Sequence, residues 1–268
     1  MQVVLFCLTV LWAPVEIVNA CFPVLITARL ASSRLPRKHL LQIAPGRTVI
    51  GCLIERLQAS FDFRLVLCIP EGPDNAPLQR IALDKGIECY GGDPDNVLRR
   101  YAQAMAHLKT EAAVIVDADD LFVSAEAIQH IIEIYAGEDV IRFAGMAYGG
   151  APYLLSLRFV HAMLDAEASP QGWSAILDRI PGKKLILHNF EVAPEEQLYR
   201  LSLDYREDFE FLQFIYHQLG PGLTHRDVIA YITTNKSALT RQFPGLFDGS
   251  MAEHARLHLA EPERLSKS

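Results

Sequence analysis

The segment between residues 24 and 38 constrains the fold and the chemistry of this chain more than any other. It begins with the apolar run Val24-Leu25-Ile26 and passes directly into a loop that carries four cations and two serines, namely Arg29, Ser32, Ser33, Arg34, Arg37 and Lys38. A strand of an open parallel α/β sheet ends at the crevice in which ligands bind. The pattern therefore predicts a ligand-binding loop at a sheet edge, and a solvated basic loop after a strand is the alternative.

The residue types in this loop suit a nucleotide polyphosphate. Arg29, Arg34 and Lys38 would neutralise its charge, while Ser32, Ser33 and backbone N–H groups would donate hydrogen bonds to its oxygens. The chain as a whole is acidic, with a formal net charge of −7, which argues against a general nucleic-acid binder. An anionic ligand must therefore be held by local cations such as these.

Helix and strand signals alternate after this loop, which is typical of a parallel sheet. Apolar residues at helical spacing predict a helix over 49–57 and another over 97–108, the latter capped by Asp95. Apolar runs predict strands over 65–69, 87–90 and 113–116, and a helix is predicted over 74–85. We expect residues 22–220 to form one α/β domain with a doubly wound, mostly parallel sheet.

The two ends of the chain are expected to lie outside this domain. Residues 1–21 are largely apolar and end like a secretory signal, but they lack Lys and Arg, and their apolar run is too short to span a bilayer. We expect a poorly packed or non-native extension rather than a working signal. The tail 221–268 is predicted to contain a helix over 224–231 and either to pack on the domain or to support a homodimer.

Two acidic turns follow further apolar runs. The sequence Asp117-Ala118-Asp119-Asp120 comes after the strand predicted at 113–116, and Asp204 comes after the apolar segment 201–203, which we interpret as another strand. Carboxylates at strand ends suit Mg²⁺, which often takes one or two protein carboxylates and completes its shell with water and phosphate. The alternative is that these acids serve as turn residues and helix caps.

The loop after the first strand also resembles a known family. Its pattern Ala-Arg-x-x-Ser-x-Arg-Leu-Pro-x-Lys, which occupies residues 28–38, is similar to the signature of the sugar cytidylyltransferases. That family includes the 3-deoxy-manno-octulosonate and acylneuraminate enzymes and a spore-coat polysaccharide branch, to which the resemblance is closest. The resemblance covers residues 22–220 and implies a Rossmann-like, GT-A-like nucleotidyltransferase fold.

Carried over residue by residue, the resemblance implies a set of site residues. Catalytic roles fall on Arg29, Lys38 and Asp119, and metal contacts fall on Asp119 and Asp204. Nucleotide binding falls on Ala28, Arg29, Ser32, Ser33, Arg34, Lys38 and Arg100, and for Arg100 a solvated position on an amphipathic helix is the alternative. The chain departs from the family pattern at Arg37, Pro70, Asn96, Ala118, Leu121, Tyr205 and Arg206.

The activity implied by the resemblance is Mg²⁺-dependent transfer of CMP from CTP to a sugar acid of the nonulosonate or 3-deoxy-octulosonate type, with release of pyrophosphate. Another nucleoside triphosphate is the alternative donor. The product would serve surface polysaccharide biosynthesis, and the enzyme would be cytoplasmic, without a nucleic-acid or membrane partner. Positioning and charge neutralisation supply most of the catalysis in such reactions, so neither His161 nor His188 is assigned a catalytic role.

The residues leave two other functions open. Asp117-Ala118-Asp119 is a DxD pattern, which could hold the metal diphosphate of a nucleotide-sugar glycosyltransferase. The departures at Pro70, Asn96 and Ala118 are also compatible with a degenerate nucleotide-binding protein that performs no turnover. Pyrophosphate release separates the first prediction from both alternatives.

Overall fold

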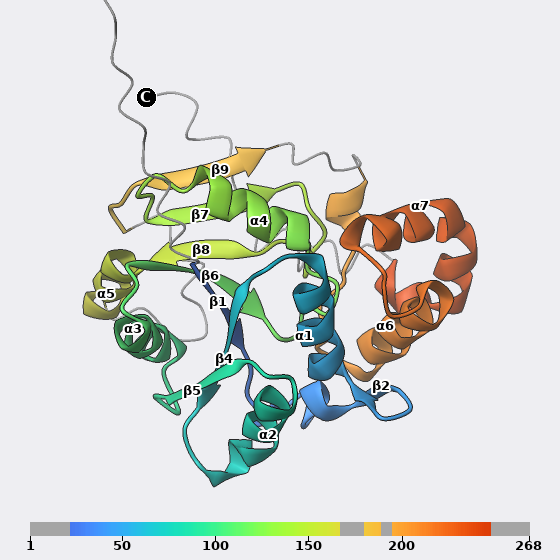
Figure 1. The fold of residues 1–268 in the computed structure, drawn as a ribbon. Coiled ribbons are helices and arrows are strands. Elements are labelled where there is room, and N and C mark those ends of the chain that lie inside the picture. The colour runs from blue at the N-terminus through green and yellow to red at the C-terminus, as the bar shows by residue number, and fades with distance from the viewer. Residues whose placement is uncertain (1–21, 167–179, 189–194, 248–268) are drawn as a thin grey trace, which may run out of the picture.

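The computed structural model describes residues 22–166, 180–188 and 195–247, which form a seven-stranded sheet with helices on both faces (Figure 1). The strand order is β5-β4-β1-β6-β8-β7-β9. Strands β1, β4, β5 and β6 run parallel, β8 is antiparallel to both of its neighbours, and β7 pairs with β9 in parallel. The predicted doubly wound, mostly parallel α/β fold is confirmed.

The elements follow one another in the expected alternation. The sheet strands are β1 (Pro23–Thr27), β4 (Arg64–Pro70), β5 (Glu88–Gly92), β6 (Ala112–Asp117), β7 (Val140–Ala144), β8 (Tyr153–Ser156) and β9 (Lys184–His188). The helices are α1 (Val49–Ser60), α2 (Ala76–Asp84), α3 (Val97–Leu108), α4 (Ala125–Ile134), α5 (Leu157–Asp165), α6 (Arg206–Leu219) and α7 (His225–Gln242). A 3-10 helix, η1 (Lys38–Leu40), precedes a small hairpin of β2 (Gln42–Ala44) and β3 (Arg47–Thr48).

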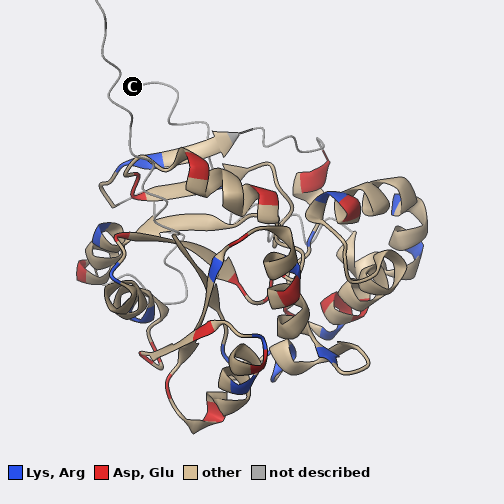
Figure 2. Cartoon of the chain, viewed as in Figure 1, with Lys and Arg blue, Asp and Glu red and all other residues tan. Residues whose placement is uncertain are grey.

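Alternating side chains along β1 divide the core into two layers. Val24 and Ile26 pack on the side of α1, α2 and α4, whereas Leu25 packs on the side of α3 and α5. All three side chains are fully buried, as expected for a central strand that is covered on both faces. Charged residues lie mainly on helices and loops, and the strands are largely uncharged (Figure 2). Apolar residues of α6 and α7 join the first layer.

The pairing of β1 with β6 determines where a ligand crevice can form. The chain leaves β1 for β4 on one side and later returns to β6 on the other, and crevices form at the carboxyl ends of the strands at such a point. Thr27 lies opposite Asp117, and the Ala118 N–H donates to the Thr27 carbonyl at 2.9 Å. The cationic loop and the acidic turn therefore begin side by side.

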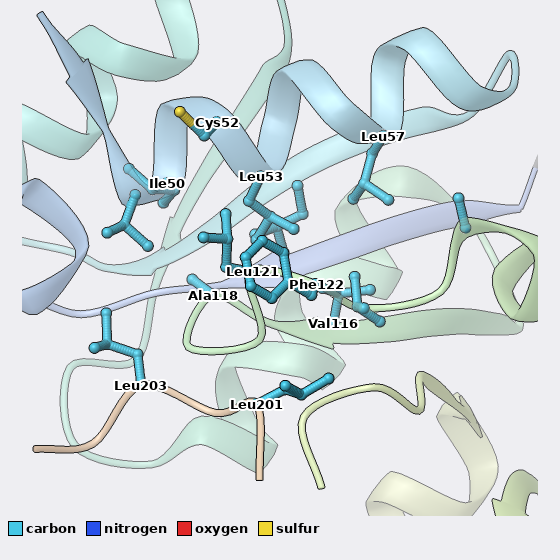
Figure 3. Packing of buried hydrophobic residues seen from close by; sticks show 14 of the residues in the cluster. Ile50, Cys52, Leu53, Leu57, Val116, Ala118, Leu121, Phe122, Leu201 and Leu203 are labelled. Atoms are coloured by element: carbon cyan, nitrogen blue, oxygen red, sulfur yellow. The ribbon is translucent and has the colours of Figure 1, made fainter. Parts of the chain in front are cut away.

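The apolar members of the acidic turn anchor it in the core. Ala118, Leu121 and Phe122 are at most 1% exposed, and they lie between α1 and the segment 201–203 (Figure 3). Leu121 therefore fills a core position. Because these apolar side chains point inward, the carboxylates between them are directed toward the crevice.

Several predicted boundaries need correction. The segment 201–204 is not a strand, because its neighbours are loops: the Leu201 N–H donates to the Tyr148 carbonyl, and the Leu203 N–H to that of Asp119. The cap of α3 is Asn96 rather than Asp95, since the Asn96 side chain accepts from the Arg99 N–H at 3.1 Å. The helix predicted over 224–231 continues to residue 242, and that over 74–85 begins with a 3-10 turn, η2 (Pro73–Asn75). The terminal segments 1–21 and 248–268 lie outside the described residues.

None of the helices within the described ranges is long and apolar enough to cross a membrane.

Candidate active site

A cavity of about 720 Å³ opens at the carboxyl ends of β1 and β6. Its walls come from the loop after β1, the start of α3, the end of β6, the segment between β7 and β8, and the stretch that carries Ser202 and Asp204. The cavity is lined by all the residues for which the sequence predicted a role, namely Ala28, Arg29, Ser32, Ser33, Arg34, Lys38, Arg100, Asp119 and Asp204. The fold therefore brings the whole predicted set to one cavity.

Lys38 lies at the centre of this set. Its Nζ contacts Asp119 Oδ2 at 2.6 Å and Asp204 Oδ1 at 3.2 Å, and it also donates to the Leu203 carbonyl at 2.7 Å. The Lys38 side chain is only 7% exposed, so its charge is balanced by these partners rather than by water. The two carboxylates predicted to bind a metal are thus linked through one buried ammonium group.

The remaining cations of the loop lie nearer to solvent. Arg34 Nη2 contacts Asp204 Oδ1 at 2.8 Å, and its guanidinium lies 5.3 Å from the centre of the Tyr205 ring. Hydrogen bonding to Tyr205, followed by the charge of Asp204, raises the pKa of Arg34 despite partial burial. Arg29 is exposed at the cavity wall, and its side chain forms no ion pair with another described residue. Both guanidiniums can therefore be reached by an incoming anion.

Arg100 has a structural contact as well as a place in the cavity wall. Its Nη1 donates to the Asp93 carbonyl at 2.7 Å, and the residue is 4% exposed. This bond fixes the turn that leads into α3. The alternative of a solvated Arg100 is wrong because the side chain is buried.

The carboxylates of the acidic turn have divergent electrostatic environments. Burial alone would raise the pKa of Asp119, but the hydrogen bond from His39 and the charge of Lys38 outweigh it and hold that pKa below its usual value. Burial and then the charge of Asp119 raise the pKa of Asp117 to about 7. Burial and the charges of Asp117 and Asp119 also raise the pKa of Asp120 well above its usual value. The environment of Asp117 and Asp120 therefore disfavours their ionised forms, whereas that of Asp119 favours its ionised form.

This donor set suits a hard divalent cation. No group of three or more His, Cys, Asp or Glu side chains within the described ranges is arranged to hold a metal by itself. Mg²⁺ does not need such a group, because one or two carboxylates suffice when a triphosphate and water supply the other oxygens. Asp119 and Asp204 line one cavity and fit that requirement.

The structure adds two residues that sequence reasoning missed. His39 contacts Asp119, and Arg200 contacts Asp204 Oδ2 at 2.6 Å and Asp208 Oδ1 at 3.2 Å. The sequence contains no usable signal for Arg200, because Arg200 and Asp204 lie in an extended segment before α6, where a spacing of four residues does not predict contact. Nothing in the sequence around His39 pointed to Asp119. His161 is exposed on α5, and the side chain of His188 lies outside the described residues.

The opposite wall of the cavity comes from residues 140–153. It contains the cation Arg142, the phenols Tyr148 and Tyr153, and the apolar residues Phe143 and Met146. The Tyr148 ring lies 5.1 Å from the guanidinium of Arg200, and its N–H donates to the Tyr199 carbonyl. The wall is therefore tied to the stretch that carries Asp204.

A cavity between a cationic loop and an acidic turn, on this sheet, places the chain among the α/β nucleotidyltransferases. The family model described as cytidylyltransferase matches residues 23–153, from β1 to the first residue of β8. This part of the chain is a cytidylyltransferase domain. The match confirms the resemblance that the loop after β1 indicated, and the enzyme is a nucleotidyltransferase.

Known proteins are similar to this chain over most of its length. The chain is 23% identical over 236 residues to the spore coat polysaccharide biosynthesis protein SpsF of Bacillus subtilis, covering 81% of this chain and 96% of that protein. A solved cytidylyltransferase of Leptospira borgpetersenii is 21% identical, with a TM-score of 0.72 and coverage of 81% of this chain and 95% of the other. CMP:2-keto-3-deoxy-manno-octonic acid synthetase, solved with CTP, is 13% identical, with a TM-score of 0.54 and coverage of 74% and 99%. These structural likenesses support the fold.

Proposed function

We propose that this enzyme transfers CMP from CTP to a sugar acid in a Mg²⁺-dependent reaction, releases pyrophosphate, and serves surface polysaccharide biosynthesis. The observation that carries this proposal is the meeting of the loop 28–38 with Asp119 and Asp204 around Lys38 in one cavity. The name of SpsF supports a role in polysaccharide biosynthesis, and that of CMP:2-keto-3-deoxy-manno-octonic acid synthetase supports the choice of nucleotide and acceptor. A nucleoside triphosphate substrate favours a cytoplasmic location.

The loop after β1 would hold the triphosphate. Arg29 and Arg34 are exposed enough to meet phosphate oxygens directly, and Ser32, Ser33 and nearby N–H groups would donate hydrogen bonds. Arg34 would exchange part of its contact with Asp204 for a contact with phosphate. Lys38 would remain buried and carry positive charge close to the transferred phosphorus, where charge neutralisation accelerates phosphoryl transfer.

The acidic turn and Asp204 would complete the catalytic set. Asp119 and Asp204 would hold Mg²⁺, which when bound supplies charge stabilisation on the phosphate oxygens. Arg200 and Lys38 would keep the Asp204 carboxylate facing the cavity through their contacts with its two oxygens. The loop and the turn together would position the α-phosphate near the acceptor oxygen, and such positioning provides much of the rate enhancement.

The wall formed by 140–153 would bind the acceptor. Within the described part of this wall, Arg142 is the one cationic lining residue, which suits a single carboxylate on the acceptor. The Tyr148 and Tyr153 hydroxyls would bind sugar hydroxyls, and Phe143 and Met146 would pack on the less polar face of the sugar. This composition supports a sugar acid as the acceptor.

Pyrophosphate release from each of the four ribonucleoside triphosphates, measured with Mg²⁺ across a panel of eight- and nine-carbon keto sugar acids and sugar phosphates, tests the proposal. We expect release with CTP and one sugar acid, and its loss in Asp119→Ala and Asp204→Ala variants that remain folded. Full rates in both variants would contradict the assigned site. Release of a nucleoside diphosphate from a nucleotide sugar would instead support the DxD glycosyltransferase. Nucleotide binding without any product would support the non-catalytic alternative.

A further inference from the structure

His39 lies beneath the loop 28–38, called the nucleotide loop below, and directly follows Lys38 in the 3-10 helix η1. It is 3% exposed. Arg37, the residue before this helix, has a left-handed backbone with φ of 55°, which turns the chain so that both Lys38 and His39 are buried. Two successive residues therefore reach the same carboxylate from one short turn.

The imidazole of His39 connects two parts of the site. Its Nε2 lies 2.7 Å from Asp119 Oδ1, and its Nδ1 lies 3.1 Å from the carbonyl oxygen of Arg29. A carboxylate and a carbonyl can only accept hydrogen bonds, so His39 serves this network as a donor. It links the backbone at the start of the nucleotide loop to the acidic turn after β6.

The contact with His39 fixes the orientation of the Asp119 carboxylate. The last torsion of an aspartate side chain is broad and has a two-fold profile, so the single contact between Lys38 and Oδ2 would leave the carboxylate plane free to rotate. With Oδ1 held by His39 and Oδ2 by Lys38, both oxygens have fixed directions. Since 28% of the Asp119 side chain is exposed, the remaining lone pairs still face the cavity.

We propose that His39 is a positioning residue that orients Asp119 for metal binding and holds it in register with the nucleotide loop. The inference deepens the proposed function and rests on it, because it gives His39 a role in the same transfer reaction. His39 contacts neither the phosphates nor the acceptor in this role. It acts through Asp119, as residues that support metal ligands do in other enzymes.

Two substitutions of similar polarity separate this role from a purely structural one. In His39→Gln, the side-chain amide nitrogen lies at a reach similar to that of Nε2, so it can still donate to Asp119. In His39→Asn, the amide nitrogen lies near the place of Nδ1, where it can reach the Arg29 carbonyl but not Asp119. His161→Asn, at an exposed position on α5, is the matched control.

The first measurement is binding of Mn²⁺ to each variant in the presence of α,β-methylene-CTP, followed by electron paramagnetic resonance. We expect His39→Asn to weaken Mn²⁺ binding about 10- to 100-fold, as is usual when the partner of a metal ligand is removed. His39→Gln should regain most of that loss, and His161→Asn should match the unmodified enzyme. Equal Mn²⁺ binding in the Asn and Gln variants would overturn the proposal. If the Asn variant unfolds, the Gln variant decides, because a weakening as large as that expected for Asn would also overturn it.

Steady-state kinetics provide the second measurement. The Asn variant should lower kcat while leaving KM for CTP nearly unchanged, because the nucleotide loop keeps its own cations. A rise in KM without a fall in kcat would overturn the positioning role. Failure of the unmodified enzyme to release pyrophosphate would refute the proposed function alone, since the Mn²⁺ comparison does not depend on turnover.

Discussion

Replacement of Lys38 by Met should destabilise the fold by an amount that the contacts of Lys38 allow us to estimate. The substitution keeps most of the side-chain volume but leaves Asp119 and Asp204 without the ammonium group that joins them. Removal of one partner of a buried ion pair lowers the free energy of unfolding by about 3–5 kcal/mol. Asp204 retains Arg34 and Arg200, and Asp119 retains His39, so we expect the lower part of that range, about 3 kcal/mol.

The loss should also depend on pH. The pKa of Asp119 in the folded enzyme lies below its usual value, in part because of Lys38. The ionised carboxylate therefore contributes stability above about pH 4, and this contribution is lost as the pH falls through the folded pKa. Lys38→Met lacks the part that Lys38 supplies, so its deficit should be fully present at pH 7 and should shrink as the pH falls below about 4.

Urea denaturation at pH 7 and at about pH 3, below the usual aspartate pKa, followed by circular dichroism, measures both effects. Lys85→Met is a matched control, since Lys85 pairs with Glu55 at a partly exposed position and should cost at most about 1 kcal/mol. A deficit for Lys38→Met no larger than that of Lys85→Met, or one that is the same at both pH values, would refute the reasoning.

Three further substitutions test other parts of the structure. Asp139 accepts hydrogen bonds from Ser156, Arg158 and the Lys183 N–H, which hold its pKa below its usual value against the effect of burial. Asp139→Ala should therefore lower the free energy of unfolding by about 2–4 kcal/mol, measured by urea denaturation at pH 7. Because the ionised form is stabilising, this loss should decrease as the pH falls below about 4. Gly149 has a φ of +87°, and an added Cβ would lie 2.6 Å from the Ser202 backbone nitrogen. Gly149→Ala should therefore lower the free energy of unfolding by about 1–3 kcal/mol and reduce kcat. An unchanged melting temperature would contradict the close packing of this loop. At Arg37, Gly should be tolerated or raise stability by up to about 1 kcal/mol, while β-branched Val should lower it; equal melting temperatures for the two variants would show that the left-handed turn is not retained.

The sequence predicted from strand ends which residues would meet at one cavity. A cationic loop and an acidic turn that follow separate apolar strands must meet if those strands are parallel neighbours. Strands β1 and β6 are such neighbours, and their last residues, Thr27 and Asp117, lie opposite each other. The apolar run 201–203 correctly indicated burial, but apolar character cannot identify its partners. These are the loop carbonyls of Tyr148 and Asp119, so an extended segment forms there instead of a strand.

The contacts between side chains were harder to predict. His39 reaches Asp119 only because Arg37 adopts a left-handed conformation, and an arginine gives little indication of one. The exposure of Cys89, in contrast with the complete burial of Cys68, follows from the position of β5 at the edge of the sheet. Apolar patterning alone does not reveal which strand is at the edge.

The ion pairs around Lys38 have a consequence for the order in which the chain is synthesised. Arg34, Lys38 and Asp119 lie within the region matched by the family model, whereas Arg200, Asp204 and Asp208 follow it. The bonds that join the two groups span 166 and 170 residues. The first group has two cations and one carboxylate, and the second has one cation and two carboxylates. A nascent chain that ends before Arg200 therefore has a surplus of positive charge in this network, and the later segment supplies the opposite charge when it docks.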